Sequence, residues 1–382
     1  MEIDARELRA VASRMAKIAT REGAHSMISI RAGGGVASLS ASDGDIEVRE
    51  RVKASEGAPV ECAVKARDLA SVLGKISGAS LFLSESQTDA PHLRIESNGS
   101  RVDLPSTPLD CVPSLVHPFD SEDADVTELW FEPEGLRESA AAVMHAISHD
   151  ESRYALNGAH LRVRDGVASL EATDGHRLAR ANVCDGMEDA GDLSAILPPK
   201  AMEAIQWFAG YSVEIEIALC AVRITGGDDD PVVIARTVGA TYPNTDAVVP
   251  EEEGMASVDV CSAEARSWVA LAATCASKEL SAVDVEIDRG AGEVVVSSVD
   301  GGLDSSGSVV VREPLSDAVR GQDCRVRLAH KYLSDAIAAT SPGTGMVRIV
   351  LRGGGAPVSV LPLDASGEPV PGVVCIVMPM RG

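Results

Sequence analysis

The sequence GVASLSASDG at residues 35–44 returns almost unchanged as GVASLEATDG at residues 166–175. A more distant copy, GEVVVSSVDG, occupies residues 292–301. These positions divide the 382 residues into three nearly equal parts. Because self-similarity at a fixed period is the signature of a repeat architecture, the sequence predicts three copies of one folding unit.

Each copy lies in the same surroundings. Its ten residues alternate apolar and small side chains and end in Asp-Gly, which is typical of a strand that runs into a tight turn. Helix-like segments begin before the copies at residues 5, 133 and 262, and after them at residues 64, 197 and 328. A short strand then follows, with the sequence LRI at 93 and VRI at 222 and 347. Each unit is therefore predicted to run helix, strands, helix, strands.

The length of the unit allows each copy its own hydrophobic core, so we expect three tandem domains and not a short-period solenoid. Two helices packed on an antiparallel sheet account for the pattern, which predicts the α+β class. Acidic, proline-bearing linkers near 117–128 and 249–257 separate the units. The predicted domain ranges are 1–121, 126–250 and 256–382.

The composition favours a soluble cytoplasmic protein. No apolar run approaches the roughly 18 residues that a membrane span needs. The start, MEIDARELRA, carries charge where a signal peptide needs an apolar stretch. The eight cysteines form no CxxC pair, which argues against a zinc site or a disulfide framework. We therefore expect no metal, no cofactor and no membrane partner.

The formal net charge of −24 leaves binding to nucleic acid open. Phosphate binding needs lysine and arginine, but a local basic face can coexist with an acidic whole. The acidic residues are concentrated in FDSEDAD (119–125), GGDDD (226–230) and PEEEG (250–254), which have the composition of loops or linkers. The distribution of charge therefore matters more than its sum.

Four motifs carry a resemblance to a known family. SRYALNG (152–158), EATDGHRLA (171–179), YPNTDAVVP (242–250) and the terminal VMPMR (377–381) occur in this order. Together they resemble the DNA polymerase III beta subunit family of bacterial sliding clamps, and the three repeats extend the resemblance over the whole chain. It implies a head-to-tail homodimeric ring that encircles duplex DNA without reading its sequence and is not itself a catalyst.

The resemblance also implies protein partners. In the family, the replicative polymerase, the clamp loader and other proteins insert a short linear motif into an apolar groove between the second and third domains, and the tethered polymerase becomes processive. Leu, Val and Met side chains suit an adaptable pocket for unrelated peptides. Two of the groove residues, Arg177 and His176, are expected to supply polar anchoring at its rim. The groove residues carried over to this chain are Leu156, Thr173, Gly175, His176, Arg177, Leu178, Pro243, Val248, Tyr332, Val377, Met378, Pro379, Met380 and Arg381.

Two further sets of residues follow from the resemblance. Sliding needs weak and diffuse phosphate contacts, which basic helices inside the ring would supply. The residues expected to face DNA are Arg6, Arg9, Arg14, Lys17, Arg21, Lys65, Arg67, Arg153, Tyr154 and Lys200. At the expected dimer edge, the residues are Val102 and Leu104 of one chain, facing Thr274 and Cys275 of the other.

The sequence departs from the family pattern at some of these places. Gly382 follows MPMR where the family usually has an apolar residue. Ala247 and Thr245 stand where a basic and an aromatic residue are common. Thr274 and Cys275 replace apolar residues at the dimer edge. These departures imply an altered preference for partner motifs and a weaker dimer.

Simpler interpretations of the same residues stay open. Asp174-Gly175 alone is typical of a hairpin turn, and its copies at Asp43-Gly44 and Asp300-Gly301 indicate a structural role. What the second repeat adds is the following His-Arg-Leu. The basic residues of the first helix are, by themselves, typical of a solvated face.

Two rival functions belong to other classes. An enzyme would use Asp174, His176 and Arg177 as an acid–base site, but no GxSxG, HExxH or Walker pattern accompanies them. The other alternative is a clamp-fold adaptor that binds partner peptides without encircling DNA.

Overall fold

The structure is a computed structural model that describes most of the chain in two compact units. Unit 1 consists of Met1–Pro133 and Lys200–Thr237, and unit 2 of Glu134–Pro199 and Val238–Gly382. The described residues are 1–86, 90–121, 125–208, 210, 212–227, 231–250, 254–276, 279–299, 309–315, 318–341, 343–353 and 355–380.

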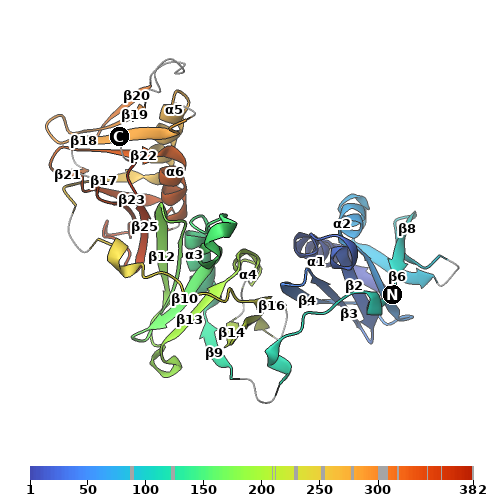
Figure 1. Ribbon diagram of the computed structural model, residues 1–382. Helices are drawn as coiled ribbons and strands as arrows, with labels where there is room; N and C mark the ends of the chain where they lie inside the picture. The colour runs from blue at the N-terminus through green and yellow to red at the C-terminus, as the bar shows by residue number, and fades with distance from the viewer. Residues whose placement is uncertain are drawn as a thin grey trace. The chain divides into compact units, whose positions relative to one another are not determined.

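The order of elements repeats three times along the described chain. Each repeat has one strand, a helix, four strands, a second helix and three strands, and the third repeat adds a short strand, β21 (Val319–Gly321). All six predicted helices form, and they agree with the α+β class (Figure 1). The domain ranges 1–121, 126–250 and 256–382 stay a prediction, because the two compact units divide the chain differently.

Unit 1 is built on one sheet. Its described strands follow the order β1-β6-β7-β8-β5-β2-β3-β4-β16-β15-β14-β9. Helices α1 and α2 contact each other and lie against β3, β4 and β5. The strands are β1 (Glu2–Asp4), β2 (Met27–Gly33), β3 (Val36–Ser42), β4 (Ile46–Lys53), β5 (Val60–Lys65), β6 (Ser80–Ser86), β7 (His92–Ser97), β8 (Ser100–Thr107), β9 (Thr127–Phe131), β14 (Val213–Ala218), β15 (Ala221–Thr225) and β16 (Val232–Arg236). The helices are α1 (Ala5–Ile18), α2 (Ala66–Lys75) and α4 (Pro199–Ile205).

Unit 2 contains two sheets. One has the order β13-β10-β11-β12-β25-β24-β23-β17-β21, and the other has the order β20-β19-β18-β22. Helix α5 packs on α6 and on β18 and β19. The remaining strands are β10 (Ala159–Arg164), β11 (Val167–Thr173), β12 (Arg177–Cys184), β13 (Leu193–Leu197), β17 (Ala256–Cys261), β18 (Ala282–Asp288), β19 (Glu293–Ser298), β20 (Val310–Pro314), β22 (Cys324–Ala329), β23 (Met346–Leu351), β24 (Val358–Pro362) and β25 (Val373–Val377). The helices are α3 (Pro133–Met144), α5 (Ser262–Ala273) and α6 (His330–Ala339).

The decapeptides form β3, β11 and β19, and the Asp-Gly turn follows the first two. Gly44 and Gly175 have φ angles of +92° and +87°, a left-handed conformation that glycine adopts without steric cost. Asp174 Oδ1 accepts hydrogen bonds from the backbone nitrogens of the second and third residues after it, at 2.9 and 3.1 Å. Asp43 makes the equivalent pair at 2.9 and 3.0 Å. The predicted structural role of these two turns is confirmed, whereas Asp300-Gly301 lies outside the described residues.

Successive repeats are joined by strand pairing. Strand β16 of the second repeat pairs with β4 of the first, and β25 of the third repeat pairs with β12 of the second. Strands β4 and β12 each come directly after the decapeptide strand of their repeat. In both joints, such a strand forms hydrogen bonds with the last strand of the next repeat. The joints therefore use equivalent strands, and each removes an exposed sheet edge.

Helix α1 is fixed by polar contacts at its start and in its middle. Asp4 caps its start, because Oδ1 accepts hydrogen bonds from the backbone nitrogens of Arg6 and Glu7 at 2.8 and 2.9 Å. From the middle of the helix, Arg9 donates to the carbonyl oxygens of Leu73 at 2.7 Å and Ile76 at 2.5 Å. These carbonyls belong to the end of α2, where backbone acceptors lack helical partners. Arg9 therefore ties α1 to α2.

We predict that Asp4→Ala weakens α1 by about 1 kcal/mol, because two backbone N–H groups lose their acceptor. Hydrogen exchange of the α1 amides should accelerate by about fivefold, and the urea midpoint should fall. Asp4→Asn keeps an acceptor at the same position and serves as the matched control. Equal exchange rates in Asp4→Ala and the wild type would contradict the capping role.

Candidate functional site: an apolar groove in unit 2

An open cavity of about 480 Å³ lies in unit 1 and carries mainly polar side chains, whereas a more apolar one lies in unit 2. The unit 2 cavity measures about 330 Å³. Strand β11 ends at it, β12 begins beside it, and the 3₁₀ turn η4 (Glu151–Leu156) and the end of β25 complete its walls. It is lined by Leu156, Thr173, Gly175, Arg177, Leu178, Pro243, Asn244, Thr245, Val248, Ile376 and Met378.

The cavity gathers many of the residues that the resemblance assigned to the groove. Those in its lining are Leu156, Thr173, Gly175, Arg177, Leu178, Pro243, Val248 and Met378. The sequence did not indicate Asn244 or Ile376 as groove residues. Ile376 is the register partner of Leu178, so its place follows from the β12–β25 pairing and not from a local motif.

The remaining groove candidates lie beside the cavity or beneath it. Val377 is fully buried and pairs with Arg177 across the two strands. Met378 extends the chain past β25, and its nitrogen donates to the carbonyl oxygen of His176 at 2.9 Å. Pro379 and Met380 are half-buried, and Met380 donates to the carbonyl of Arg327. Arg381 and Gly382 lie outside the described residues.

Arg177 is a buried tie between β12 and α6. Its side chain donates to Asp174 Oδ2 at 3.0 Å and to Asp335 Oδ2 at 2.7 Å. The guanidinium carbon lies 4.5 Å from the ring centre of Tyr332, and the ring of His176 stacks on the same tyrosine at 6.3 Å. Arg177 is only 8% exposed. The expected rim anchor is therefore already occupied by two carboxylates, which fixes the groove wall on α6.

A polar network holds the segment that carries Pro243 and Val248. The buried carboxylate of Glu171 accepts hydrogen bonds from Thr245 Oγ1 at 2.6 Å and from Arg180 Nε at 2.9 Å. His160 lies 2.8 Å from its other oxygen and stacks on Tyr242 at 4.7 Å. Thr245, noted above as a departure from the family pattern, lines the groove and directs its hydroxyl to Glu171 in this network.

The charge of Glu171 depends on this network. Burial acts to raise the pKa of Glu171, but hydrogen bonds from His160 and Thr245 and the positive charges of Arg180 and Arg162 outweigh it and lower the pKa to about 2. The carboxylate is therefore ionised under ordinary conditions. An ionised acid that is 1% exposed is tolerated only because its partners surround it.

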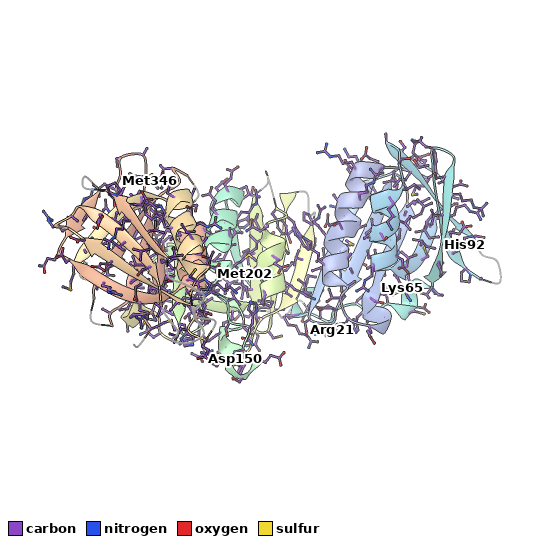
Figure 2. The ribbon with its side chains drawn as sticks, turned by 90° about the horizontal axis from the view of Figure 1, so that it is seen from above. Arg21, Lys65, His92, Asp150, Met202 and Met346 are labelled. Carbon is purple, nitrogen blue, oxygen red and sulfur yellow. The ribbon has the colours of Figure 1, made fainter. Side chains whose placement is uncertain are left out.

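The residues expected to face DNA divide into two groups. Arg6 and Lys17 of α1 are exposed, as are Lys65 immediately before α2 and Arg67 within it, and within the described residues these four form no ion pair. Lys65 is labelled in Figure 2. The other group is engaged within the protein, and it consists of Arg9, Arg14, Arg21, Arg153 and Lys200.

The engaged basic residues have identifiable partners. Arg14 Nε donates to the buried Glu50 at 2.8 Å. Lys200 donates to Asp43 Oδ2 at 2.5 Å, and Arg21 donates to the carbonyl of Asp43 at 2.6 Å. These contacts fix structure in unit 1 and leave less freedom for contact with phosphates.

Arg153 and Tyr154 lie in η4 beside the groove. Arg153 donates to the carbonyl oxygen of Asp174 at 2.8 Å, so it braces the Asp-Gly turn. Tyr154 is 60% exposed. The structure thus associates Arg153 with the groove turn, and its expected contact with DNA stays a prediction.

The expected dimer edge is only partly apolar. Leu104 is 8% exposed, Val102 is half-buried, and Thr274 is exposed, with its hydroxyl donating to the carbonyl of Leu271 at 2.7 Å. Cys275 is half-buried. Two exposed apolar side chains were not indicated by the sequence: Leu271 in α5 and Val310 at the start of β20 are each 53% exposed.

The described residues contain neither a metal-binding cluster nor a helix that could cross a membrane. No group of three or more His, Cys, Asp or Glu side chains in this part of the chain is arranged to hold a metal ion. None of its helices combines the length and apolar character needed to cross a bilayer.

The fold is that of the clamps of bacterial DNA polymerases. It matches the crystal structure of the DNA polymerase III subunit beta from Pseudomonas aeruginosa with a TM-score of 0.82 and 19% sequence identity, covering 100% of both chains. Residues 131–244 match the family model described as the DNA polymerase III beta subunit, central domain.

Curated relatives agree with this match. The beta sliding clamp of Rickettsia bellii is 25% identical over 231 residues, which are 59% of this chain and 58% of that protein. The beta sliding clamp of Caulobacter vibrioides is 28% identical over 235 residues, covering 59% and 61%. The match thus spans about three fifths of each relative's length. The family model, the relatives and the fold all point to one family, the DNA polymerase III beta subunit, to which this chain is similar over the stretches given.

We predict that Glu171→Gln lowers the free energy of unfolding of unit 2 at neutral pH. In this variant, that free energy should also fall less as the pH is lowered. A pKa lowered by folding contributes stability above the ordinary value of 4.5, and this contribution is lost as the pH falls through about 2. The shift corresponds to roughly 3 kcal/mol. Urea unfolding at several pH values between 2 and 7 measures it. Glu151→Gln, at an exposed position, is the control, and an unchanged slope in Glu171→Gln would contradict the assignment.

Proposed function

We propose that this chain is a DNA sliding clamp, in which two copies close into a ring around duplex DNA. The ring would tether a replicative polymerase and other proteins that carry a clamp-binding linear motif. The observation that carries the proposal is that two strands keep an unpaired edge after the repeats have paired with one another.

The two joints within the chain follow one rule, which predicts a third joint. Strand β4 pairs with β16, and β12 pairs with β25. Strand β20 of the third repeat is equivalent to β4 and β12, and β8 of the first repeat is equivalent to β16 and β25. Neither β20 nor β8 takes part in a joint within the chain. Within the described residues, β20 pairs with β19 alone, and β8 pairs with β7 and, at its last two residues, with β5.

A second copy satisfies both edges at once. Pairing β20 of one chain with β8 of the other is a heterologous contact, and two such contacts close a ring of six repeats. The exposed Val310 and Leu271 on one side and Val102 and Phe82 on the other supply apolar surface for it. Of the residues that the resemblance assigned to the dimer edge, Val102 and Leu104 lie on β8, and Thr274 and Cys275 follow the end of α5, so the proposed joint would include them.

The exposed cations of the helices support the DNA-binding part of the proposal. Arg6 and Lys17 on α1, with Lys65 and Arg67 at α2, present positive charge on a chain of net charge −24. Such contacts bind the phosphate backbone without reading bases, which is what sliding requires.

The groove supports the tethering part of the proposal. An apolar cavity with Leu156, Leu178, Val248 and Met378 in its walls accepts the apolar side chains of a short peptide. Tethering replaces repeated encounters with a high effective concentration of the polymerase at its template. The role needs no catalytic residue in this chain, so the chemistry of synthesis would belong to the partner.

We predict a concentration-dependent dimer that is retained on nicked circular DNA after loading and lost from linear DNA of the same length. Sedimentation equilibrium and gel filtration of the DNA complex measure the two properties. Val310→Asp should dissociate the dimer and abolish retention, because it places a charge in the proposed joint. Arg289→Asp, at an exposed position in unit 2, is the control. A wild-type monomer that binds peptides but is never retained would favour the adaptor alternative and overturn the clamp proposal.

We predict that Met378→Asp with Val248→Asp weakens binding of a peptide carrying the clamp-binding motif of a bacterial replicative polymerase by at least about tenfold, because a carboxylate has no partner in an apolar pocket. Fluorescence anisotropy measures the affinity. Met346→Asp changes an exposed methionine of unit 2 outside the groove and should bind as the wild type does. Undiminished affinity in the double variant would remove the groove from the proposal.

A further inference from the structure

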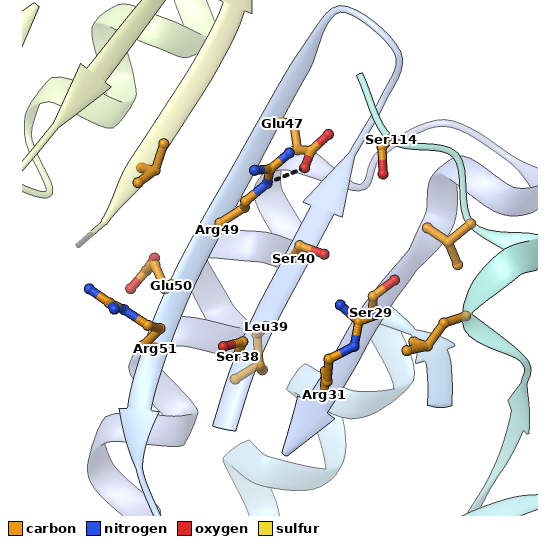
Figure 3. A pocket seen from close by; sticks show the side chains of 13 residues that line it. Ser29, Arg31, Ser38, Leu39, Ser40, Glu47, Arg49, Glu50, Arg51 and Ser114 are labelled. Atoms are coloured by element: carbon orange, nitrogen blue, oxygen red, sulfur yellow. Dashed lines mark hydrogen bonds and ion pairs between the residues drawn. The ribbon is translucent and has the colours of Figure 1, made fainter. Parts of the chain in front are cut away.

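The face of the unit 1 sheet that points away from α1 carries a polar cavity. Glu50 of β4 reaches Arg14 on α1, so the alternating neighbours Arg49 and Arg51 project from the other face. The cavity on that face measures about 480 Å³. In Figure 3, the side chains of Arg31, Arg49 and Arg51 lie around the serines of β3.

The same strand positions occur in the second repeat, where the pairing is known residue by residue. In the first repeat, Arg31 pairs with Ser38, and in the second, Arg162 pairs with Ser169. The two repeats differ in the next cross-strand pair of residues. Ser40 faces Arg49 where the second repeat has Glu171 facing Arg180. The first repeat thus keeps both arginines, Arg31 and Arg49, but has Ser40 at the position of Glu171.

In the second repeat, carboxylates neutralise these arginines. Arg180 bonds to Glu171 at 2.9 Å and to Asp246 at 2.7 Å. Arg162 lies 3.2 Å from the same aspartate. The arginines there are structural, because they hold the segment beside the groove to the sheet.

In the first repeat, Arg31 and Arg49 have fewer carboxylate contacts than their counterparts, whereas Arg51 has a partner of its own. Glu47 accepts from Arg49 Nε at 2.6 Å and also from the backbone nitrogen of Leu115 at 2.6 Å. The terminal nitrogens of Arg49 donate no hydrogen bond within the described part of the chain. The ion pair of Arg31 with Glu61 is long, at 3.9 Å, and both side chains are more than 60% exposed, so it contributes little.

We propose that this cavity binds a phosphate-type oxyanion, either free or as the terminal phosphates of a nucleotide. Guanidinium groups bind phosphate oxygens through two parallel hydrogen bonds, and the hydroxyls of Ser38 and Ser40 add donors to the floor of the site. The chain's net charge of −24 repels anions in general, so the site depends on its local arginines. The volume is sufficient for a pyrophosphate group.

Calorimetric titration of the full chain with pyrophosphate, and separately with ATP, at 0.15 M salt tests the proposal. We expect saturable binding at one site per chain. Ser40→Glu restores the acid of the second repeat and should lower the affinity by about tenfold or more. ATP binding more tightly than pyrophosphate would identify a nucleotide as the source of the phosphates, and equal affinities would identify the free anion.

Three further variants, one of them a control, keep the test decisive. Arg49→Gln should also abolish binding, but it leaves the buried Glu47 with only the backbone nitrogen of Leu115 as a partner, so its fold must be checked by circular dichroism. Arg31→Gln changes an exposed side chain and should lower the affinity without affecting the fold. Arg101→Gln removes one exposed positive charge elsewhere in unit 1 and should bind as the wild type does. No saturable binding, equal binding by Ser40→Glu, or equal loss in Arg101→Gln would overturn the proposal.

Discussion

A strand at the edge of a sheet leaves backbone N–H and C=O groups without partners, and this constraint decides how the repeats of the chain are connected. The last strand of one repeat pairs with the strand after the decapeptide in the preceding repeat, as β16 does with β4 and β25 with β12. The positions of the groove and of the outer arginines depend on these two joints. The groove exists because β25 carries Ile376 and Met378 to the start of β12.

The repeated fold keeps strand positions constant while the side chains on them take different tasks. Asp43 and Asp174 form the same turn, but the second oxygen of Asp43 binds Lys200 and that of Asp174 binds Arg177. On the outer face, Glu171 neutralises an arginine where Ser40 does not. One scaffold therefore accommodates a structural network in one repeat and, in another, a polar cavity where Ser40 stands in place of the acid.

The repeat and its helices were predictable, because apolar positions such as Leu8, Val11 and Met15 recur at helical spacing and are buried. The joints between repeats leave no local signal in the sequence. Arg177 illustrates the consequence, because its partner Asp335 lies 158 residues away and turns an expected rim residue into a buried tie.

The pairing of β4 with β16 has a consequence for synthesis of the chain. The first sheet uses residues 46–53 together with residues 232–236, so a growing chain cannot complete it until most of the second repeat has left the ribosome. Until then, the β4 edge is open to pairing with a neighbouring nascent chain. The charged residues Glu47, Arg49 and Arg51 on this edge disfavour such contacts during the interval.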